Sequence, residues 1–325
     1  MDCLLKGELK KLNNYTYTLK YENDYALDMV LKRGIKNVAD LAKTMQRHFG
    51  AKNGDIKMSG SGFACTTFNH FTESGDHILA RNFDYKDAPA IVVWTAPENG
   101  YKSVAMTDTN VMLYGEKLGE AKNKNRLLLA PYACMDGINE KGLAIAVLEI
   151  KTKATHQHTG KRSITTTVMI RAVLDKCATV DEAVEMFKRY DMQDSLFCNY
   201  HYQIADASGK TILIEYVNNE MRLIEPEDKI QYVMNFFKSP DGDNKKGFGY
   251  TRQKWIEAAF AESKGVMSEQ EAMKLLEKCK LDYKHKRGYQ ITSLWSAVYN
   301  CQRCSMLLST GMDYSKQFEF DVNYR

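Results

Sequence analysis

Three residues whose types suit nucleophilic catalysis follow one another at short spacing: Cys65, Arg81 and Asp84. A nucleophile needs a base, a group that stabilises its charge and donors aimed at the developing oxyanion. Residues 65–71 are rich in β-branched and aromatic side chains and predict a strand, and residues 77–83 predict the returning arm of a hairpin. The hairpin would bring a cation and a carboxylate beside the thiol. On spacing alone this signal is weak, because Arg and Asp after a strand usually form surface ion pairs.

The elements that must position this hairpin are expected in the order strand pairs, two helices, strands, a helical pair and closing strands. Capping boxes predict helices near 180–190 and 268–279, and a further helix is expected over 251–262. This order favours antiparallel sheets covered by helices, which is an α+β fold. The remaining strands are expected at 90–95, 143–150, 202–205, 211–216, 230–236, 292–299, 305–309 and 318–322.

The first 64 residues differ from the rest, since they are lysine-rich and are expected to be mainly helical. Residues 38–49 place apolar side chains on one helical face, with Asn37 as the cap and Gly50 as the stop. A second helix is expected over 25–33. Such a regular apolar face needs a surface to dock on, so we expect this segment to stay bound. The small residues of 58–63 then lead into the predicted strand.

Six motifs follow one another in order along residues 65–325: 65–68 with 81–85, 136–143, 202–216, 233–236, 250–252 and 295–300. This series resembles the choloylglycine hydrolase family, which includes bile salt hydrolases, penicillin V acylases and, more distantly, acid-ceramidase-like amidases. The resemblance implies an αββα four-layer sandwich of antiparallel sheets, the fold of hydrolases with an N-terminal nucleophile. It also implies a helical pro-segment over 1–64 and a catalytic domain over 65–325.

Carried over to this chain, the resemblance implies that Cys65 is the nucleophile and that the chain cuts itself between Ala64 and Cys65. Arg81 would steady the thiolate, and Asp84 would orient the new α-amine. A thiol has a pKa near ~8.5 and an α-amine near ~7.7 to 8.0, so a terminal cysteine carries its own base. Before the cut that nitrogen is an amide, and the precursor is expected to be an inactive zymogen.

The resemblance also implies an oxyanion hole built from the side-chain amide of Asn235 and the backbone N–H of Glu149, with Arg252 completing a positive rim near Asp84. Two positions depart from the family pattern. Met234 stands where threonine is common, and Glu149 stands where bile salt hydrolases have Asn and penicillin V acylases have Tyr. Neither specificity can therefore be assigned.

The function implied is an autoprocessing amidase that hydrolyses a linear amide C–N bond through a thioester. The small-molecule substrate would be an N-acyl amide, such as a bile acid conjugate, a penicillin V-like amide or an N-acyl amino acid. Two alternatives remain: acyl transfer to an amine by the same cysteine, and a non-catalytic binding protein on this scaffold. No cofactor and no metal is expected, and assembly into a homo-oligomer is left open.

The bulk composition argues against a nucleic-acid-binding protein, a membrane-spanning protein and a secreted protein. The chain has 325 residues, 45 basic and 41 acidic side chains spread along it and a formal net charge of +4, so nucleic acid is a poor guess for a partner. No stretch approaches the ~18 apolar residues of a membrane span, and the start lacks a signal-peptide core. We expect a cytoplasmic protein whose eight cysteines are mostly reduced.

Three features have plainer interpretations than the chemistry they suggest. Cys65 taken alone would be a buried structural cysteine, the usual state of a cysteine in a strand. Cys301 and Cys304 form a lone CxxC, which predicts a strand turn better than a metal or redox site. His156 and His158 are expected on a solvated loop rather than at a metal.

Overall fold

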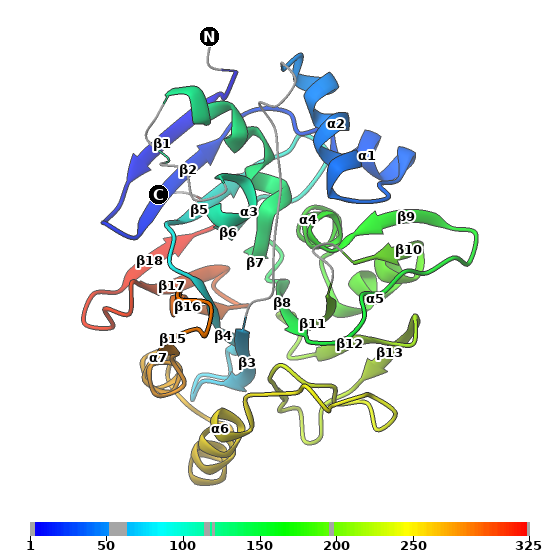
Figure 1. Ribbon diagram of the computed structural model, residues 1–325. Helices are drawn as coiled ribbons and strands as arrows, with labels where there is room; N and C mark the ends of the chain where they lie inside the picture. The colour runs from blue at the N-terminus through cyan, green and yellow to red at the C-terminus, as the bar shows by residue number, and fades with distance from the viewer. Residues whose placement is uncertain (1–3, 52–63, 114–117, 119–120, 195–197, 324–325) are drawn as a thin grey trace.

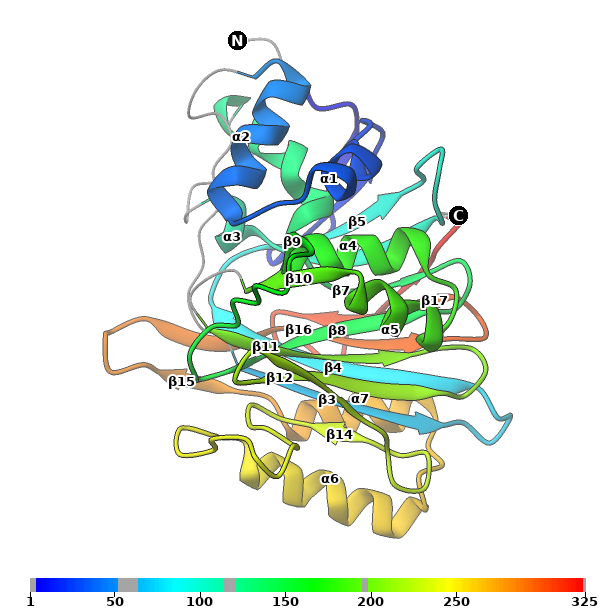
Figure 2. The same cartoon turned by 90° about the vertical axis from the view of Figure 1, so that its right-hand side faces the viewer.

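The two large sheets of this chain stack face to face between helices. The computed structural model describes residues 4–51, 64–113, 118, 121–194 and 198–323 (Figure 1); the small-residue segment 58–63 lies outside them. In Figure 2, α4 and α5 lie above the sheets and α6 and α7 lie below them. The α+β fold of four layers expected from the sequence is confirmed.

The nine-stranded sheet has the order β1-β2-β5-β6-β7-β8-β11-β12-β13. Neighbours pair antiparallel except β2 and β5, which run parallel. Its strands are β1 (Gly7–Lys11), β2 (Thr16–Tyr21), β5 (Ala90–Thr95), β6 (Ser103–Asp108), β7 (Cys134–Asn139), β8 (Ala144–Ile150), β11 (Asn199–Ala205), β12 (Thr211–Val217) and β13 (Glu220–Ile224).

The seven-stranded sheet carries the predicted hairpin at its centre. Its order is β14-β3-β4-β16-β17-β18, with β15 paired to β16, and all its pairs are antiparallel. The strands are β3 (Ala64–Phe71), β4 (His77–Lys86), β14 (Tyr232–Val233), β15 (Asp282–Lys284), β16 (Gln290–Asn300), β17 (Ser305–Thr310) and β18 (Phe318–Asp321). Two short parallel strands, β9 (Arg162–Thr165) and β10 (Tyr190–Gln193), form a separate pair.

Three of the described helices begin where side-chain capping signals place them. Ser268 and Glu271 form a complete capping box at the start of α7, and the Thr179 hydroxyl accepts the N–H of Glu182 at the start of α5. Asn37 caps α2 through the N–H of Asp40. The helices are α1 (Leu27–Arg33), α2 (Val38–Phe49), α3 (Thr109–Leu113), α4 (Thr166–Lys176), α5 (Val180–Lys188), α6 (Tyr250–Ser263) and α7 (Glu269–Lys278), with a 3-10 segment at Ala121–Ala133.

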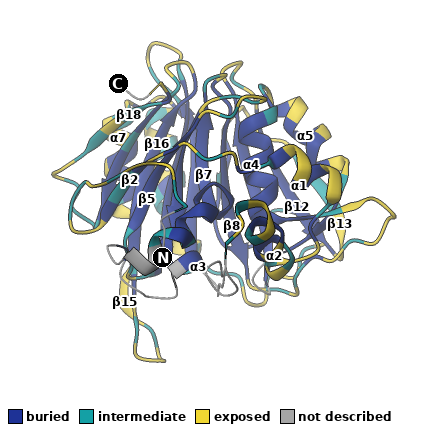
Figure 3. Ribbon diagram, turned by 90° about the horizontal axis from the view of Figure 1, so that it is seen from above, coloured by how far each residue is buried: buried dark blue, intermediate teal, exposed yellow. Residues whose placement is uncertain are grey.

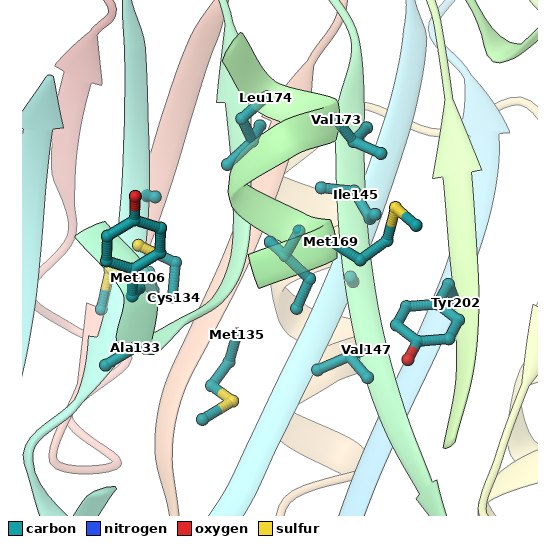
Figure 4. Packing of buried hydrophobic residues seen from close by; sticks show 14 of the residues in the cluster. Met106, Ala133, Cys134, Met135, Ile145, Val147, Met169, Val173, Leu174 and Tyr202 are labelled. Atoms are coloured by element: carbon teal, nitrogen blue, oxygen red, sulfur yellow. The ribbon is translucent and has the colours of Figure 1, made fainter. Parts of the chain in front are cut away.

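Helix α4 is the centre of the core on the outer face of the nine-stranded sheet. Met169 and Val173 of α4 pack against Ile145 and Val147 of β8, beside Tyr202 of β11 (Figure 4). Figure 3 shows this helix and the strands as buried, while exposed residues gather on α1, α2, α5 and the loops. A second, smaller core fills the space between β3, β4, β16 and the helices α6 and α7.

The expectation that the first 64 residues are mainly helical is wrong for their first third. Helices α1 and α2 are present, but residues before them form β1 and β2, which extend the nine-stranded sheet. β1 has a mostly exposed, lysine-containing sequence that shows no alternation of apolar and polar residues. Lysines on such an edge strand discourage pairing with other chains.

No helix among the described residues has both the length and the apolar character needed to cross a membrane.

Candidate active site

The start of β3 places Cys65 opposite Phe83 of β4, and two residues further along Thr67 faces Arg81. The Cys65 side chain is fully buried, and Nη2 of Arg81 lies 2.9 Å from its Sγ. The hairpin therefore brings the predicted cation to the predicted nucleophile, as the spacing of the two residues suggested.

Arg81 is held by a buried network that sequence reasoning did not find. Asp136 of β7 forms an ion pair with Nη1 of Arg81 and accepts hydrogen bonds from Nε1 of Trp295, at 3.1 Å, and from the hydroxyl of Tyr299. Nη2 of Arg81 also donates to the carbonyl of Val147 at 3.2 Å. Burial lowers the pKa of Arg81, but the charge of Asp136, its hydrogen bond to the guanidinium and the nearby Cys65 and Tyr299 together outweigh burial, and the pKa lies above its ordinary value. The guanidinium therefore stays charged beside the thiol.

Asp84 faces Ala64 across the β3–β4 ladder, at the bond where the cut is expected. Its Oδ2 accepts Nη1 of Arg252 at 3.2 Å, and its Oδ1 accepts the hydroxyl of Ser293. A register shift in β16 between Ser293 and Trp295 interrupts the ladder with β4 at this point. Burial raises the pKa of Asp84 to about 6, although Arg252 and the Ser293 hydroxyl act in the opposite direction. Ser293 is a second partner that the sequence did not reveal.

Arg252, in the first turn of α6, contacts the carbonyl of Cys65 and the residue that follows it. Its Nη1 donates to the Cys65 carbonyl at 2.9 Å and to Oγ1 of Thr66 at 2.7 Å, and its Nη2 donates to Oδ1 of Asn235 at 3.1 Å. One guanidinium thus joins Cys65, Asp84 and Asn235.

Asn235 lies just beyond β14 and binds both sheets. Its Oδ1 accepts the backbone N–H of Cys65 at 3.0 Å, and its Nδ2 donates to the carbonyl oxygen of Glu149 at 2.9 Å. Glu149 is therefore in the site, where its contact with Asn235 is made by the carbonyl; the expected role of its N–H stays a prediction.

Burial raises the pKa of the Cys65 thiol to about 12, and the charge of Arg81 lowers it only in part. In this chain the thiol is neutral near pH 7 and closed off from solvent.

Six residues are predicted for the site in addition to Ala64. All six lie together: Cys65, Arg81, Asp84, Glu149, Asn235 and Arg252.

The other candidate motifs lie elsewhere in the fold. Cys301 and Cys304 delimit the turn between β16 and β17, and His156 and His158 are exposed between β8 and β9. Within the described part of the chain, no three His, Cys, Asp or Glu side chains are grouped so that they could hold a metal ion.

Known proteins resemble this chain in both sequence and fold. It is 29% identical to a penicillin V acylase from Pectobacterium atrosepticum over 201 residues, which is 54% of this chain and half of the length of that relative. A conjugated bile acid hydrolase from Clostridium perfringens has a similar fold, with a TM-score of 0.58 and 14% identity over 80% of this chain and 92% of that one. A penicillin V acylase from Agrobacterium tumefaciens follows with a TM-score of 0.56 and 18% identity over 80% and 86% of the two chains.

The family model of the linear amide C–N hydrolases, choloylglycine hydrolase family, matches residues 65–235, more than half of the chain. The match begins at the residue on which Arg81, Asn235 and Arg252 converge. This chain belongs to the choloylglycine hydrolase family of linear amide C–N hydrolases.

Proposed function

We propose that this hydrolase is made as a precursor, cuts itself between Ala64 and Cys65 and then uses the new N-terminal cysteine to hydrolyse a small N-acyl amide. The observation that carries the proposal is the set of contacts to Cys65. Its Sγ, its N–H and its carbonyl are bound by Arg81, Asn235 and Arg252 respectively. Every buried residue needs partners for its backbone groups, but a structural cysteine would need no guanidinium at its sulfur.

The self-cleavage step moves an acyl group from nitrogen to sulfur. Sγ of Cys65 attacks the carbonyl carbon of Ala64, the C–N bond breaks, and the nitrogen takes up the thiol proton as it becomes an amine. Asn235 holds this nitrogen through its Oδ1. Water then hydrolyses the thioester, so that Ala64 ends in a carboxylate and Cys65 begins with an amine.

Turnover repeats this chemistry on a substrate. The α-amine takes the thiol proton, the sulfur attacks the substrate amide carbonyl, and the proton passes to the departing amine. The remaining thioester is hydrolysed by water, which releases the acid. Arg81 stabilises the thiolate, Asp84 orients the amine, and the amide of Asn235 with the N–H of Glu149 stabilises the oxyanion.

We also propose that residues 1–64 remain bound as a small subunit. β2 pairs with β5 along five residues, and Leu19, Leu41 and Met45 are fully buried in the main core. Separating the segment would expose this apolar surface at a cost of about 25 cal/mol per Å².

The substrate is proposed to be an N-acyl amide by analogy with the relatives, whose names denote a penicillin V acylase and a conjugated bile acid hydrolase. The family's amide chemistry is common to both, while Glu149 and Met234 give no choice between them.

Intact-mass analysis and Edman degradation of the purified full chain test the proposal. We expect a large fragment that begins at Cys65 and a small fragment that ends at Ala64. Cys65→Ala should give one uncut chain, whereas Cys177→Ala, which changes a buried cysteine at the C-terminal end of α4, should be cut normally. A cut that persists in Cys65→Ala would point to another protease and would overturn self-cleavage.

A further inference from the structure

The backbone just after Asn235 is fastened by a buried carboxylate from the opposite sheet. Glu215 lies in β12, and its Oε1 accepts the N–H of Lys238 at 2.8 Å. Its Oε2 accepts both the N–H and the hydroxyl of Ser239, at 3.0 and 2.7 Å. Glu215 therefore ties the nine-stranded sheet to the chain that follows β14 in the seven-stranded sheet.

A histidine completes the set of donors around this carboxylate. Nδ1 of His201, in β11, lies 3.1 Å from Oε1 of Glu215, and both side chains are fully buried. Burial would raise the pKa of Glu215, but the hydrogen bonds from His201, Lys238 and Ser239 outweigh it, and the pKa lies below its ordinary value. An ionised carboxylate accepts hydrogen bonds only, which matches a site lined by donors.

The ladder of the seven-stranded sheet does not reach Asn235. The ladder between β14 and β3 ends at Val233, two residues earlier. Beyond the ladder, the chain is held by the hydrogen bond from the N–H of Phe248 to the Asn235 carbonyl, at 3.3 Å, and by Asn244, which bonds both the N–H and the carbonyl of Phe237. Glu215 fixes the next two residues, 238 and 239.

Asn235 must meet two atoms on different sheets at once. Cys65 N belongs to β3, and the Glu149 carbonyl belongs to β8. Glu215 lies in the same sheet as β8, two strands away. The hydrogen bonds from Lys238 and Ser239 to Glu215 connect the two sheets close to the place where the Asn235 amide spans them.

We infer that Glu215 is a positioning residue for the amidase reaction, which holds the segment 235–239 so that the Asn235 amide stays aligned with Cys65, and that His201 orients Glu215. This inference rests on the proposed function, because it assigns Glu215 an effect that passes through Asn235.

The test compares self-cleavage rates of full-length chains made by cell-free translation and followed on denaturing gels. Glu215→Gln keeps the size of the side chain but turns an N–H₂ group toward backbone N–H donors. We expect self-cleavage to slow roughly 10-fold or more. The matched control is Asp206→Asn, another buried carboxylate that accepts backbone N–H groups, from Val180 and Ser208, and a serine hydroxyl; it should be cut at the wild-type rate.

A double-mutant cycle separates positioning from a general structural role. In an Asn235→Ala background, Glu215→Gln should slow self-cleavage less than about 2-fold further, because its route to the site has been removed. An equal slowing in both backgrounds would overturn the inference, as would a wild-type rate in Glu215→Gln. If Glu215→Gln does not fold, Ser239→Ala removes only the hydroxyl contact and should show the same non-additivity at smaller amplitude. Failure of the wild-type chain to cut would instead overturn the proposed function.

Discussion

The side-chain oxygen of Asn235 accepts a hydrogen bond from the backbone N–H of Cys65 at 3.0 Å. The nitrogen in this bond belongs to the peptide link at which the family match begins. The other end of the same amide donates to the Glu149 carbonyl. Asn235 thus uses its acceptor and its donor at once, and the two halves of the amide can be tested separately.

Replacing Asn235 by Asp keeps an acceptor for the Cys65 N–H but removes the donor. We expect Asn235→Asp and Asn235→Ala to slow amide hydrolysis by about 10² to 10³, the usual loss for one oxyanion donor. The rates should be measured with penicillin V and a glycine-conjugated bile acid, alongside thermal melting. If Asn235→Asp retained wild-type turnover, the Asn235 side chain would not serve as an oxyanion donor.

The ion pair between Arg81 and Asp136 predicts a large effect on stability. Both side chains are fully buried, so Asp136→Asn leaves the guanidinium without a compensating charge. We expect the free energy of unfolding, measured with urea, to fall by about 3–5 kcal/mol. Asp181→Asn changes an exposed carboxylate paired with Lys210 and should cost under ~1 kcal/mol. A similar small loss in Asp136→Asn would mean that Arg81 is not held by this charge.

The raised pKa of Asp84 predicts how self-cleavage depends on pH. The carboxyl loses its proton near pH 6, and only the ionised form pairs fully with Arg252. Self-cleavage should therefore rise as the pH increases through about 6. Because the folded-state pKa lies above the unfolded value, the folded chain binds more protons between about pH 4 and 6, and Asp84 makes stability fall as pH rises through that window.

Ser293→Ala provides a matched variant for this pH profile. The Ser293 hydroxyl donates to Asp84 and lowers its pKa, so removing it should shift the midpoint of self-cleavage to higher pH. Ser315→Ala changes an exposed serine whose hydroxyl donates to Asp313, so it should leave the midpoint unchanged. A midpoint that stays the same in Ser293→Ala would show that the pH dependence of self-cleavage does not come from Asp84.

Spacing along the sequence predicts only the part of the site that is built on one local hairpin, whereas Asn235, Glu149 and Arg252 are predicted from the family resemblance. Residues 65–71 and 77–83 carried strand and turn signals, and pairing them brought Arg81 and Asp84 to Cys65. Asp136 and Ser293 could not be assigned in this way, since each reaches the site from another strand and only the sheet order shows which strand is adjacent. The motif containing Asp136 was recognised, but its contact with Arg81 was not.

The fold shows the same limit. Helix α4 is not among the helices expected from the sequence. It is buried on almost every side, so its sequence lacks the division into an apolar and a polar face that predicted α2. The strand expected over 230–236 shortens to Tyr232–Val233, because the chain leaves the ladder to cross toward Glu215. β1 was missed because an exposed edge strand carries little pattern.

The last prediction concerns the interface between residues 1–64 and the rest of the chain. The Tyr25 hydroxyl donates to Oδ2 of Asp175 at 2.6 Å, and Arg171 pairs with Oδ1 of the same carboxylate. The carbonyl of Tyr25 accepts the hydroxyl of Tyr132 at 2.6 Å. Tyr25→Phe removes a donor from a buried carboxylate and should weaken binding of the small fragment by about 1–3 kcal/mol.

Size-exclusion chromatography of the cut protein in increasing urea measures this loss. The wild-type fragments should elute together without urea, and the Tyr25→Phe fragments should separate at a lower urea concentration. Tyr15→Phe is the control, since Tyr15 lies in the same segment but is 46% exposed. Elution of the wild-type small fragment on its own in native buffer would show that the segment is discarded after the cut. If the Tyr25→Phe and Tyr15→Phe fragments separated at the same urea concentration, retention of the small fragment would still hold. The hydrogen bond between Tyr25 and Asp175 would then not contribute to it.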